Sequence, residues 1–468
     1  MTNEPQKLSI REKVSYGFGD LASVLYWQTF MLYFTYFYTD VFLIPAATAA
    51  TLFLISRIFD GINDPIVGMI ADRTKTRWGK FRPYILWLCV PFAIMGVLTF
   101  TVPDYETKGK IIWAYITFNG IMMLYTAINI PYTALLGVIS ADSKERTTVS
   151  SVKFLFAYAA GTIVSATLLP MVKYFGKGDE AHGWQMSFVV YGIAAVVFFM
   201  ITFLGTKERV QPPKAQKSSA KKDIFELITN GPWLILLATT IAFILFVAVR
   251  GSVTAHYFKY VIGEQKLSLP FFAADKTYSW EALVSGFNTV GQISAIIGVL
   301  IINWFAKVVG KKKAFVIFFL LAIVCTASFY FLTAEQMGLI FILQIIGSMT
   351  GGPLSVLLWA MYADTADYAE WKRGRRATGL IFSASTMSQK FGWAFGAYLA
   401  LTLMAQVGFA PNQEQTTESL RGLILLFTLI PAGIGILSII LLLVYPLGDK
   451  RVAVIEAELI ERRNKEEQ

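Results

Sequence analysis

Two aspartates and an asparagine lie at helical spacing within an apolar segment that begins near Ala46. Asp60 and Asp64 are four residues apart with Asn63 between them, so a helix places all three on one face. Each carboxylate in a lipid-embedded helix costs about 2.5–3.5 kcal/mol by insertion scales. Hard cations such as Na⁺ bind oxygen ligands, so a bound cation would offset this cost. The alternative is a static ion pair with Arg57, one turn earlier.

Further polar residues fall at a similar depth when the predicted spans are laid out in order. Asp60 lies thirteen residues before Arg73, roughly 20 Å along a helix, and Lys390 lies fourteen residues after Arg376. Lys390 would be a countercharge that a cation displaces, or a fixed partner of a carboxylate. Other polar and aromatic side chains would line the cavity or pack between helices: Asp20, Thr126, Asn129, Thr133, Arg250, Gln344, Trp359 and Thr386.

The elements that carry these residues are predicted to be membrane helices. The chain has 468 residues, of which 55% are hydrophobic and only 15% charged, and its mean hydropathy is +0.56. A soluble domain carries about 25% charged residues, so the composition is that of a membrane protein. Cys89 and Cys325 lie in apolar segments and predict no disulfide framework. His182 and His256 are too few and too far apart to predict a His/Cys metal site.

The net charge of +10 could indicate a nucleic-acid partner, but its distribution argues against one. Lys and Arg cluster in alternate loops, near residues 73–82, 144–146, 311–313 and 372–376, which is the positive-inside pattern. The predicted outside loops, 41–45 and 408–417, hold almost none. We therefore expect a multi-pass protein of the cell (inner) membrane, with both termini in the cytoplasm and no signal peptide.

About twelve stretches are long and apolar enough to span a membrane. They are predicted near residues 15–38, 46–71, 83–103, 111–139, 150–174, 186–205, 233–262, 282–306, 314–333, 337–362, 378–407 and 421–446. These spans predict four regions: an N-terminal six-helix half (1–205), a cytoplasmic linker (206–232), a C-terminal six-helix half (233–446) and a cytoplasmic tail (447–468). The charged tail is expected to form a solvated helix.

A weak internal repeat relates the two halves. Acidic residues follow the fourth and the tenth span, and a base then opens the next span. Six spans plus six predict an all-α major facilitator fold, whose halves rock around a site in the middle of the membrane. Charged residues at these span ends would close a cytoplasmic gate, or would only anchor helix ends: Asp72, Arg73, Asp142, Arg146, Asp364, Asp367 and Arg376.

Short motifs along the chain are specific in residue type and spacing. They are Ser15-Tyr16-Gly17-Phe18-Gly19, Tyr38-Thr39-Asp40, Arg57-Ile58-Phe59-Asp60-Gly61-Ile62-Asn63-Asp64-Pro65, Arg77-Trp78-Gly79-Lys80-Phe81, and Ala363-Asp364-Thr365 with Asp367-Tyr368 and Lys390. Together they resemble the glycoside–pentoside–hexuronide:cation symporters, the melibiose permease-like branch of the major facilitator superfamily. The resemblance covers nearly the whole chain and implies sugar uptake driven by Na⁺, H⁺ or Li⁺.

The resemblance also implies sites. The family's cation site falls on Asp60, Asn63, Asp64, Thr126 and Lys390, with Asp60 and Asp64 as metal ligands if the ion is Na⁺. On the sugar side, Val24 and Asn129 stand where galactoside-binding members have aspartates, so melibiose itself is not the expected substrate. The candidate substrate-binding residues are Asp20, Ser23, Asn129, Thr133, Lys153, Arg250, Trp359, Ser385 and Thr386.

The loss of these acids while bases remain predicts a sugar that carries a carboxylate, such as a hexuronide. Its carboxylate would pair with Arg250 or Lys153 by charge-assisted hydrogen bonds. In the alternative, Arg250 snorkels or pairs within the outer half of the membrane, and the substrate is a pentoside or a short oligosaccharide. Asn129 removes one acid from near the cation site, so the choice between Na⁺ and H⁺ stays open.

The sequence as a whole predicts a twelve-span secondary active symporter that imports a glycoside with Na⁺ or H⁺. A cation-coupled transporter of a non-sugar amphiphile, such as a lysolipid, is the alternative. No nucleophile–base constellation or phosphate-binding loop indicates an enzyme, and no cofactor is expected. We expect a monomer whose partners are a small-molecule sugar and membrane lipid, with no nucleic acid.

Overall fold

The chain is almost entirely helical. The computed structural model describes residues 7–140, 143–209, 228–266, 276–373 and 378–466. In these ranges a single short hairpin, β1 (Gln265–Lys266) with β2 (Thr277–Tyr278), accompanies the helices. The chain divides into two compact units. Unit 1 contains Met1–Ala215, Glu281–Thr289 and Phe409–Glu414, and unit 2 contains the remaining residues.

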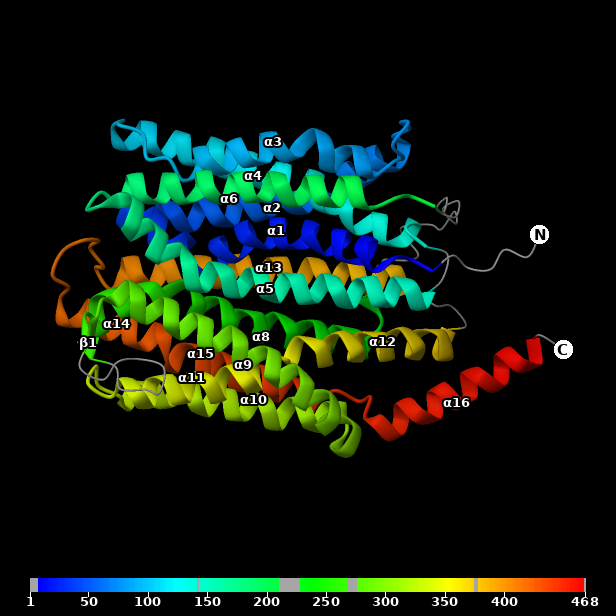
Figure 1. Cartoon of the computed structure of the whole chain (residues 1–468). Helices are drawn as coiled ribbons and strands as arrows, with labels where there is room; N and C mark the ends of the chain where they lie inside the picture. Colours follow the sequence, from blue (N-terminus) through cyan, green and yellow to red (C-terminus); the bar gives the residue numbers. More distant parts are fainter. Residues whose placement is uncertain (1–6, 141–142, 210–227, 267–275, 374–377, 467–468) are drawn as a thin grey trace. The chain divides into compact units, whose positions relative to one another are not determined.

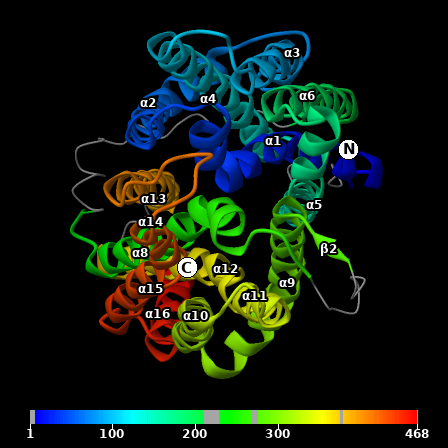
Figure 2. The same ribbon diagram turned by 90° about the vertical axis from the view of Figure 1, so that its left-hand side faces the viewer.

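Unit 1 is a bundle of six long helices. They are α1 (Ile10–Tyr36), which continues as a π-helical turn (Phe37–Val41), α2 (Ala46–Arg73), α3 (Arg82–Thr99), α4 (Thr107–Val138), α5 (Ser143–Gly176) and α6 (Glu180–Gly205). The helix α1 packs against α5 and α6, while α4 packs against α2 and α3. These helices run lengthwise beside one another in Figure 1 and are seen end-on in Figure 2.

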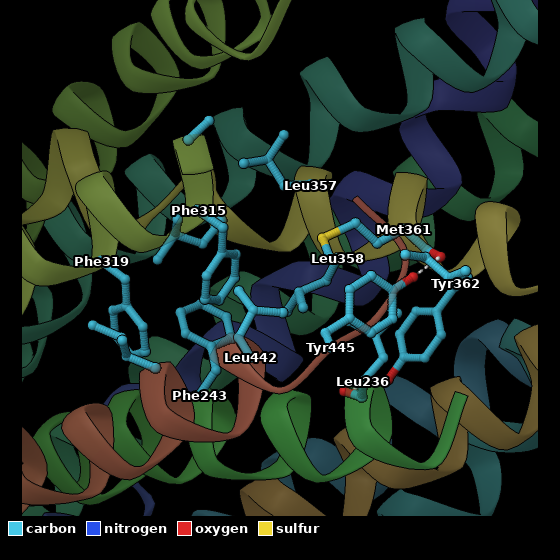
Figure 3. Packing of buried hydrophobic residues seen from close by; sticks show 14 of the residues in the cluster. Leu236, Phe243, Phe315, Phe319, Leu357, Leu358, Met361, Tyr362, Leu442 and Tyr445 are labelled. Atoms are coloured by element: carbon cyan, nitrogen blue, oxygen red, sulfur yellow. Dashed lines mark hydrogen bonds between the residues drawn. The ribbon is translucent and has the colours of Figure 1, made fainter. Parts of the chain in front are cut away.

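Unit 2 contains α8 (Gly231–His256), which continues as a π-helical turn (Tyr257–Ile262), most of α9 (Trp280–Val309), α10 (Lys311–Ser328), α11 (Met337–Gly351), α12 (Leu354–Arg373), α13 (Thr378–Gln406), α14 (Thr417–Phe427), α15 (Leu429–Leu443) and α16 (Asp449–Glu466). The helix α8 lies at its centre and contacts α13, α14 and α15. Aromatic rings fill the core beside it: Phe243 of α8 packs edge-on against Phe315 and Phe319 of α10 (Figure 3).

Nine stretches in the described part of the chain are long and apolar enough to cross a membrane. The three remaining long helices, α1, α2 and α13, have 27, 28 and 29 residues. They carry Asp20, Asp60 with Asp64, and Lys390, which are four of the ionisable residues of the predicted site. We infer that the polar side chains needed for function lower the hydropathy of these three helices.

Two predicted spans are each made of two helices. The span predicted at 337–362 is interrupted at Gly352 and Pro353 and then continues as α12 to Arg373. Proline has no backbone N–H, so the helical hydrogen-bond ladder is broken at that point. The span predicted at 421–446 changes direction at Thr428, whose backbone is non-helical (φ −123°, ψ −83°). Pro431 then lies in the first turn of α15, where its missing N–H costs little.

The tail is helical, as predicted, but it is not solvated on all sides. Val452, Ile455 and Leu459 of α16 are buried, and α16 packs against α12. Their spacing of three and four residues gives the tail an apolar face. The indole N–H of Trp371 on α12 donates a hydrogen bond to Glu458 of α16. The sequence predicted a solvated helix, and the structure adds an apolar face that packs against α12.

Candidate functional site

The face of α2 predicted from spacing alone meets a hydroxyl group from α4. Asp60 is buried, Asn63 is buried and Asp64 is half-buried. The Thr126 hydroxyl oxygen lies 3.2 Å from Asp60 Oδ1 and 3.1 Å from Asp64 Oδ1. A hydroxyl has one hydrogen, so it can donate fully to only one of these carboxylates at a time. The three oxygens therefore converge in the way that oxygen ligands converge on a small cation.

Arg57 holds the other oxygen of Asp60. Its Nη1 donates to Asp60 Oδ2 at 3.2 Å, and its side chain is fully buried. The guanidinium lies between two rings, 4.6 Å from the centre of Trp27 on α1 and 4.8 Å from that of Phe53 on α2. Such aromatic faces stabilise a cation electrostatically. The static ion pair and the converging oxygens were alternatives at the level of sequence, and in the structure they coexist on Asp60.

Asn63 supplies an amide on the same face. Its Nδ2 is buried and has no hydrogen-bond partner among the residues that the structure describes. A buried amide that holds no other part of the fold is available for a ligand. The described residues contain no group of three or more His, Cys, Asp or Glu side chains arranged to hold a metal. Because Arg57 already pairs with Asp60, the two carboxylates and this guanidinium carry one net negative charge, which one monovalent cation balances.

A second charged pair lies between α1 and α5. Lys153 Nζ is 3.6 Å from Asp20 Oδ1 and 5.6 Å from the centre of the Tyr132 ring of α4. Both residues were predicted to bind substrate, and the structure brings them together. Tyr132 is fixed by Tyr16, because each phenol donates to the other residue's backbone carbonyl, at 2.8 and 3.0 Å. Their rings stack with centroids 4.6 Å apart.

The remaining candidates of unit 1 lie in different environments. Ser23 is buried and donates to the Gly19 carbonyl of its own helix, so its hydroxyl is already engaged. The amide of Asn129 is half-buried and donates to the carbonyl of Tyr125. Thr133 is exposed. Of these three residues, Asn129 and Thr133 present side chains outside the buried core.

The candidates of unit 2 include two that its own packing engages. Arg250 donates to Gln344 at 3.1 Å and lies against the rings of Phe329 and Phe427. Ser385 is buried and accepts from the indole N–H of Trp233. Three others present partly or fully exposed side chains: Trp359, Thr386 and Lys390. The expected approach of Lys390 to the aspartates of α2 stays a prediction.

The residues predicted for a gate include two with partners inside their own unit. Lys311 donates to Asp364 at 2.6 Å in unit 2, and Arg146 donates to the Ser140 carbonyl at 2.9 Å in unit 1. Arg73 is exposed and Asp367 is half-buried. Asp142, Arg376 and the side chain of Asp72 lie outside the described residues. Each of the two observed contacts lies within one unit, so the role of these residues in a gate stays a prediction.

Residue spacing did not predict the aromatic enclosure of Arg57. Trp27 and Phe53 come from two helices, and Trp27 also stacks on Tyr125 of α4 with centroids 5.5 Å apart. Their contacts depend on how α1, α2 and α4 pack. A pattern within one helix carries no signal for such a contact.

Comparison with known proteins identifies the family of this chain. Residues 15–449 match the family model described as MFS/sugar transport protein. The chain is 36% identical over 436 residues to the isoprimeverose transporter of Lactiplantibacillus pentosus, covering 92% of this chain and 88% of the relative. It is 35% identical over 440 residues to the inner membrane symporter YicJ of Escherichia coli (strain K12), with 93% and 91% covered. Identity to the glucuronide carrier protein homolog of the same organism is 28% over 464 residues, with 99% and 98% covered.

Solved structures show the same fold at low sequence identity. The nucleoside transporter NupG aligns with a TM-score of 0.61 at 14% identity, covering 93% of this chain and 99% of that one. A proton-dependent oligopeptide transporter aligns with a TM-score of 0.67 at 12% identity, covering 96% and 100%. This likeness concerns the fold alone. Together with the family match over nearly the full length, it shows that the chain belongs to the MFS/sugar transport proteins, multi-pass membrane transporters of the major facilitator fold.

Proposed function

We propose that the chain is a symporter that imports a glycoside together with one monovalent cation. The observation that carries the proposal is the Thr126 hydroxyl placed 3.2 and 3.1 Å from the carboxylates of Asp60 and Asp64. This cluster joins α2 to α4 by oxygens that a cation can ligate. The names of the relatives, an isoprimeverose transporter and a glucuronide carrier protein homolog, support a sugar as the second substrate.

Cation binding at this cluster changes hydrogen bonds between two helices. Before the ion arrives, the Thr126 hydroxyl points its hydrogen at a carboxylate of α2. An ion ligated by Asp60 and Asp64 needs the lone pairs of that hydroxyl, so the hydrogen must turn away. Arg57 keeps hold of Asp60 Oδ2 meanwhile. The two carboxylates then attract a shared ion instead of repelling each other. The contact between α2 and α4 changes, because the hydrogen bond from Thr126 is replaced by shared ligation of the ion.

The charges of unit 1 favour a neutral sugar. The clusters described above contain three carboxylates, Asp20, Asp60 and Asp64, and two cationic groups, Arg57 and Lys153. One negative charge is in excess, and one monovalent cation balances it. The sequence-based reason for a uronide is also weakened, because Lys153 pairs with Asp20 and Arg250 bonds to Gln344. Identity is higher to the isoprimeverose transporter, at 36%, than to the glucuronide carrier protein homolog, at 28%.

The test is uptake of labelled isoprimeverose by proteoliposomes that contain the full-length protein. A Na⁺ gradient and a pH gradient are imposed separately, so that the coupling ion is identified in the same experiment. We expect accumulation with one of the two gradients, and its loss in Asp64→Asn. Asp104→Asn, the same change at an exposed loop residue, is the matched control and should accumulate normally.

The same uptake assay can also refute sugar symport. If neither gradient drives uptake of isoprimeverose or of other xylosides and glucosides, sugar symport is excluded. Uptake of a labelled lysophospholipid under the same gradients would then favour the amphiphile transporter.

A substitution at Thr126 tests the cation site itself. Thr126→Ala removes the hydroxyl oxygen that would ligate the cation, and polar contacts to charged groups contribute about 1.5–3 kcal/mol. The concentration of cation that half-saturates uptake should therefore rise by roughly tenfold to a hundredfold. Thr126→Ser keeps the hydroxyl and should stay within a few-fold of the wild type. Equal effects of the two substitutions would contradict a role for the hydroxyl.

A further inference from the structure

The ion pair between Asp20 and Lys153 has hydrogen-bonding capacity to spare. Its 3.6 Å separation exceeds the roughly 2.7–2.9 Å of a tight charge-assisted hydrogen bond. An ammonium has three donors and a carboxylate about four acceptor positions. The side chains of Lys153 and Asp20 are 20% and 12% exposed. Both groups therefore keep some uncovered surface and spare hydrogen-bonding positions beside their mutual contact.

The pair is held in place by a rigid support. Lys153 lies over the face of Tyr132, and Tyr132 is locked to Tyr16 by two reciprocal hydrogen bonds. Gly19 allows this arrangement, because a Cβ there would lie 2.5 Å from the Tyr132 ring. Three helices, α1, α4 and α5, thus converge on one ammonium group. A support this ordered keeps the ammonium beside the carboxylate rather than in free solution.

We propose that Asp20 sets the charge selectivity of the sugar site by acting on Lys153. While the carboxylate holds the ammonium, the pair is neutral as a whole and accepts a neutral glycoside. The sugar's hydroxyls donate to Asp20 and accept from Lys153, and no uncompensated charge is buried. This inference rests on the proposed function, since it names the class of sugar that the symporter takes.

An anionic sugar would be repelled at this ion pair. Its carboxylate or sulfonate would have to approach Lys153 beside the carboxylate of Asp20, and like charges in such contact repel each other strongly. Asp20 therefore determines specificity: it excludes anions by pairing with the ammonium that would attract them. Within the described residues, Asp20 has one charged partner, Lys153. Removing the charge of Asp20 should leave that ammonium for the substrate.

Two matched sugars test this inference. Methyl xylosides and methyl glucuronides have the same ring, and differ only in the carboxylate at C5. Both are supplied, as α and β anomers, to proteoliposomes that carry the full-length protein under the gradient that drives uptake. The wild type should prefer the xyloside. Asp20→Asn should shift the ratio of glucuronide to xyloside uptake by at least about tenfold toward the glucuronide.

Further variants separate charge from folding. Asp20→Glu restores the carboxylate and should restore the wild-type preference. The double variant Asp20→Asn with Lys153→Gln removes both charges, and should lose the gain in glucuronide uptake while still taking the xyloside. Lys153→Gln alone should weaken xyloside uptake and still exclude the glucuronide. A defect of packing alone would lower uptake of both sugars and would create no new substrate.

Two results would overturn the inference while leaving sugar symport intact. One is a wild type that takes the glucuronide as well as the xyloside. The other is an Asp20→Asn protein that accumulates the xyloside with an unchanged ratio. If Asp20→Asn does not fold, Lys153→Gln decides, and glucuronide uptake by it would contradict the mechanism. Failure of the wild type to accumulate any neutral glycoside would instead refute the proposed function.

Discussion

At the scale of single residues, the carboxylate of Asp60 divides its two oxygens between partners on two helices. Oδ2 accepts from Arg57 on the same helix, and Oδ1 accepts from Thr126 on α4. Taking such charges out of water costs several kcal/mol per ion, so each needs its partner. In this arrangement Arg57 pairs with one oxygen of the carboxylate, while Thr126 occupies the position that a cation would share.

Substitution of Arg57 tests how far the buried carboxylate of Asp60 depends on its guanidinium partner. Arg57→Gln leaves Asp60 buried without the guanidinium, and breaking a buried pair costs about 3–5 kcal/mol. Thermal unfolding in detergent should therefore shift to lower temperature in choline chloride. Replacing choline by Na⁺, or by the coupling ion identified in uptake assays, should restore stability more in the variant than in the wild type.

Arg57→Lys is the control for charge. It keeps the positive charge but loses the planar group that stacks between Trp27 and Phe53. We expect an intermediate loss of stability and a smaller response to the cation. Identical cation responses in the wild type and in Arg57→Gln would show that the two cations do not share Asp60.

The sequence predicted the acidic face of α2 because helical periodicity is a local property. Asp60, Asn63 and Asp64 share a face whatever packs against it. Partners from distant parts of the chain had no such signal. Asp20 and Lys153 were each expected to contact the sugar, yet nothing in their spacing of 133 residues indicated that they contact each other. That contact depends on the packing of α1 against α5.

At the scale of elements, the segment that follows α6 fastens several helix ends of unit 1. The carboxylate of Glu208 accepts from the backbone N–H groups of Lys80, Phe81 and Arg82 at 2.8–3.0 Å. These groups belong to the turn before α3 and to its first residue, where helical N–H groups lack partners of their own. Gly79 precedes them with φ +108°, and a Cβ there would lie 2.4 Å from the Glu208 carboxyl group.

Arg209, the residue after Glu208, links the same segment to α1 and α4. Arg209 donates to both carboxylate oxygens of Glu12, at 2.7 and 2.8 Å. Its backbone N–H donates to the Val138 carbonyl at the end of α4. We call residues 207–209 the clasp. The clasp thereby joins the end of the described chain after α6 to α1, α3 and α4.

Glu208→Gln tests the clasp. The carboxamide has one acceptor oxygen and an NH₂ group that faces the N–H donors, so hydrogen bonds to a charged group are lost. We expect the free energy of unfolding to fall by about 1.5–3 kcal/mol, measured by thermal unfolding in detergent. Lys207→Gln, next to it, changes an exposed side chain and should have no effect. Equal unfolding temperatures of Glu208→Gln and Lys207→Gln would show that the carboxylate of Glu208 does not stabilise the fold.

A second link between helix ends gives a pH dependence. Lys13 of α1 lies 2.8 Å from Glu145 at the start of α5, and the Leu8 N–H also donates to this carboxylate. The hydrogen bond from Lys13 lowers the pKa of Glu145 below its ordinary value of 4.5. The stability that this link contributes is therefore complete above pH 4.5, and is lost as the pH falls through the lower value of the folded protein.

Glu145→Gln should consequently lower the unfolding temperature at pH 7. The difference from the wild type should shrink as the pH falls below 4.5, because the wild-type carboxylate then becomes protonated in the folded state as well. Thermal unfolding in detergent across this pH range measures the effect. Glu106→Gln, at an exposed position before α4, serves as the matched control. A difference that stays constant with pH would show that the ion pair is not responsible.

The extents of the helices were largely predictable, whereas their interruptions and lateral contacts were not. Apolar runs predicted the positions of the long helices, because burial in lipid requires about 20 apolar residues. Pro353 marked a possible break, but proline is tolerated in membrane helices, so sequence alone did not show that α11 ends there. The clasp lies in a polar stretch without periodicity, where no pattern distinguishes a bound carboxylate from a solvated one.

At the scale of the whole molecule, symport requires two binding events to depend on each other. In unit 1 one helix touches both candidate sites. Thr126 of α4 hydrogen-bonds to the aspartates of α2. Tyr132 of α4 lies under the ammonium of Lys153 and donates to the Tyr16 carbonyl of α1. Six residues separate them, about 9 Å along the helix. We therefore expect a change in the contact between α2 and α4 to affect the residues that we propose bind the sugar.

This arrangement predicts reciprocal binding. If the coupling ion raises the affinity for a xyloside by some factor, the xyloside must raise the affinity for the ion by the same factor. Both factors can be measured by calorimetry on the purified protein, with sugar titrated with and without the ion, and the ion with and without sugar. We expect a common factor of roughly 5–150, corresponding to 1–3 kcal/mol. Thr126→Ala should reduce both factors together, because α4 then loses its bond to α2, whereas Thr126→Ser should preserve them. If the sugar site responds to the ion equally in the wild type and in Thr126→Ala, coupling does not pass through this helix.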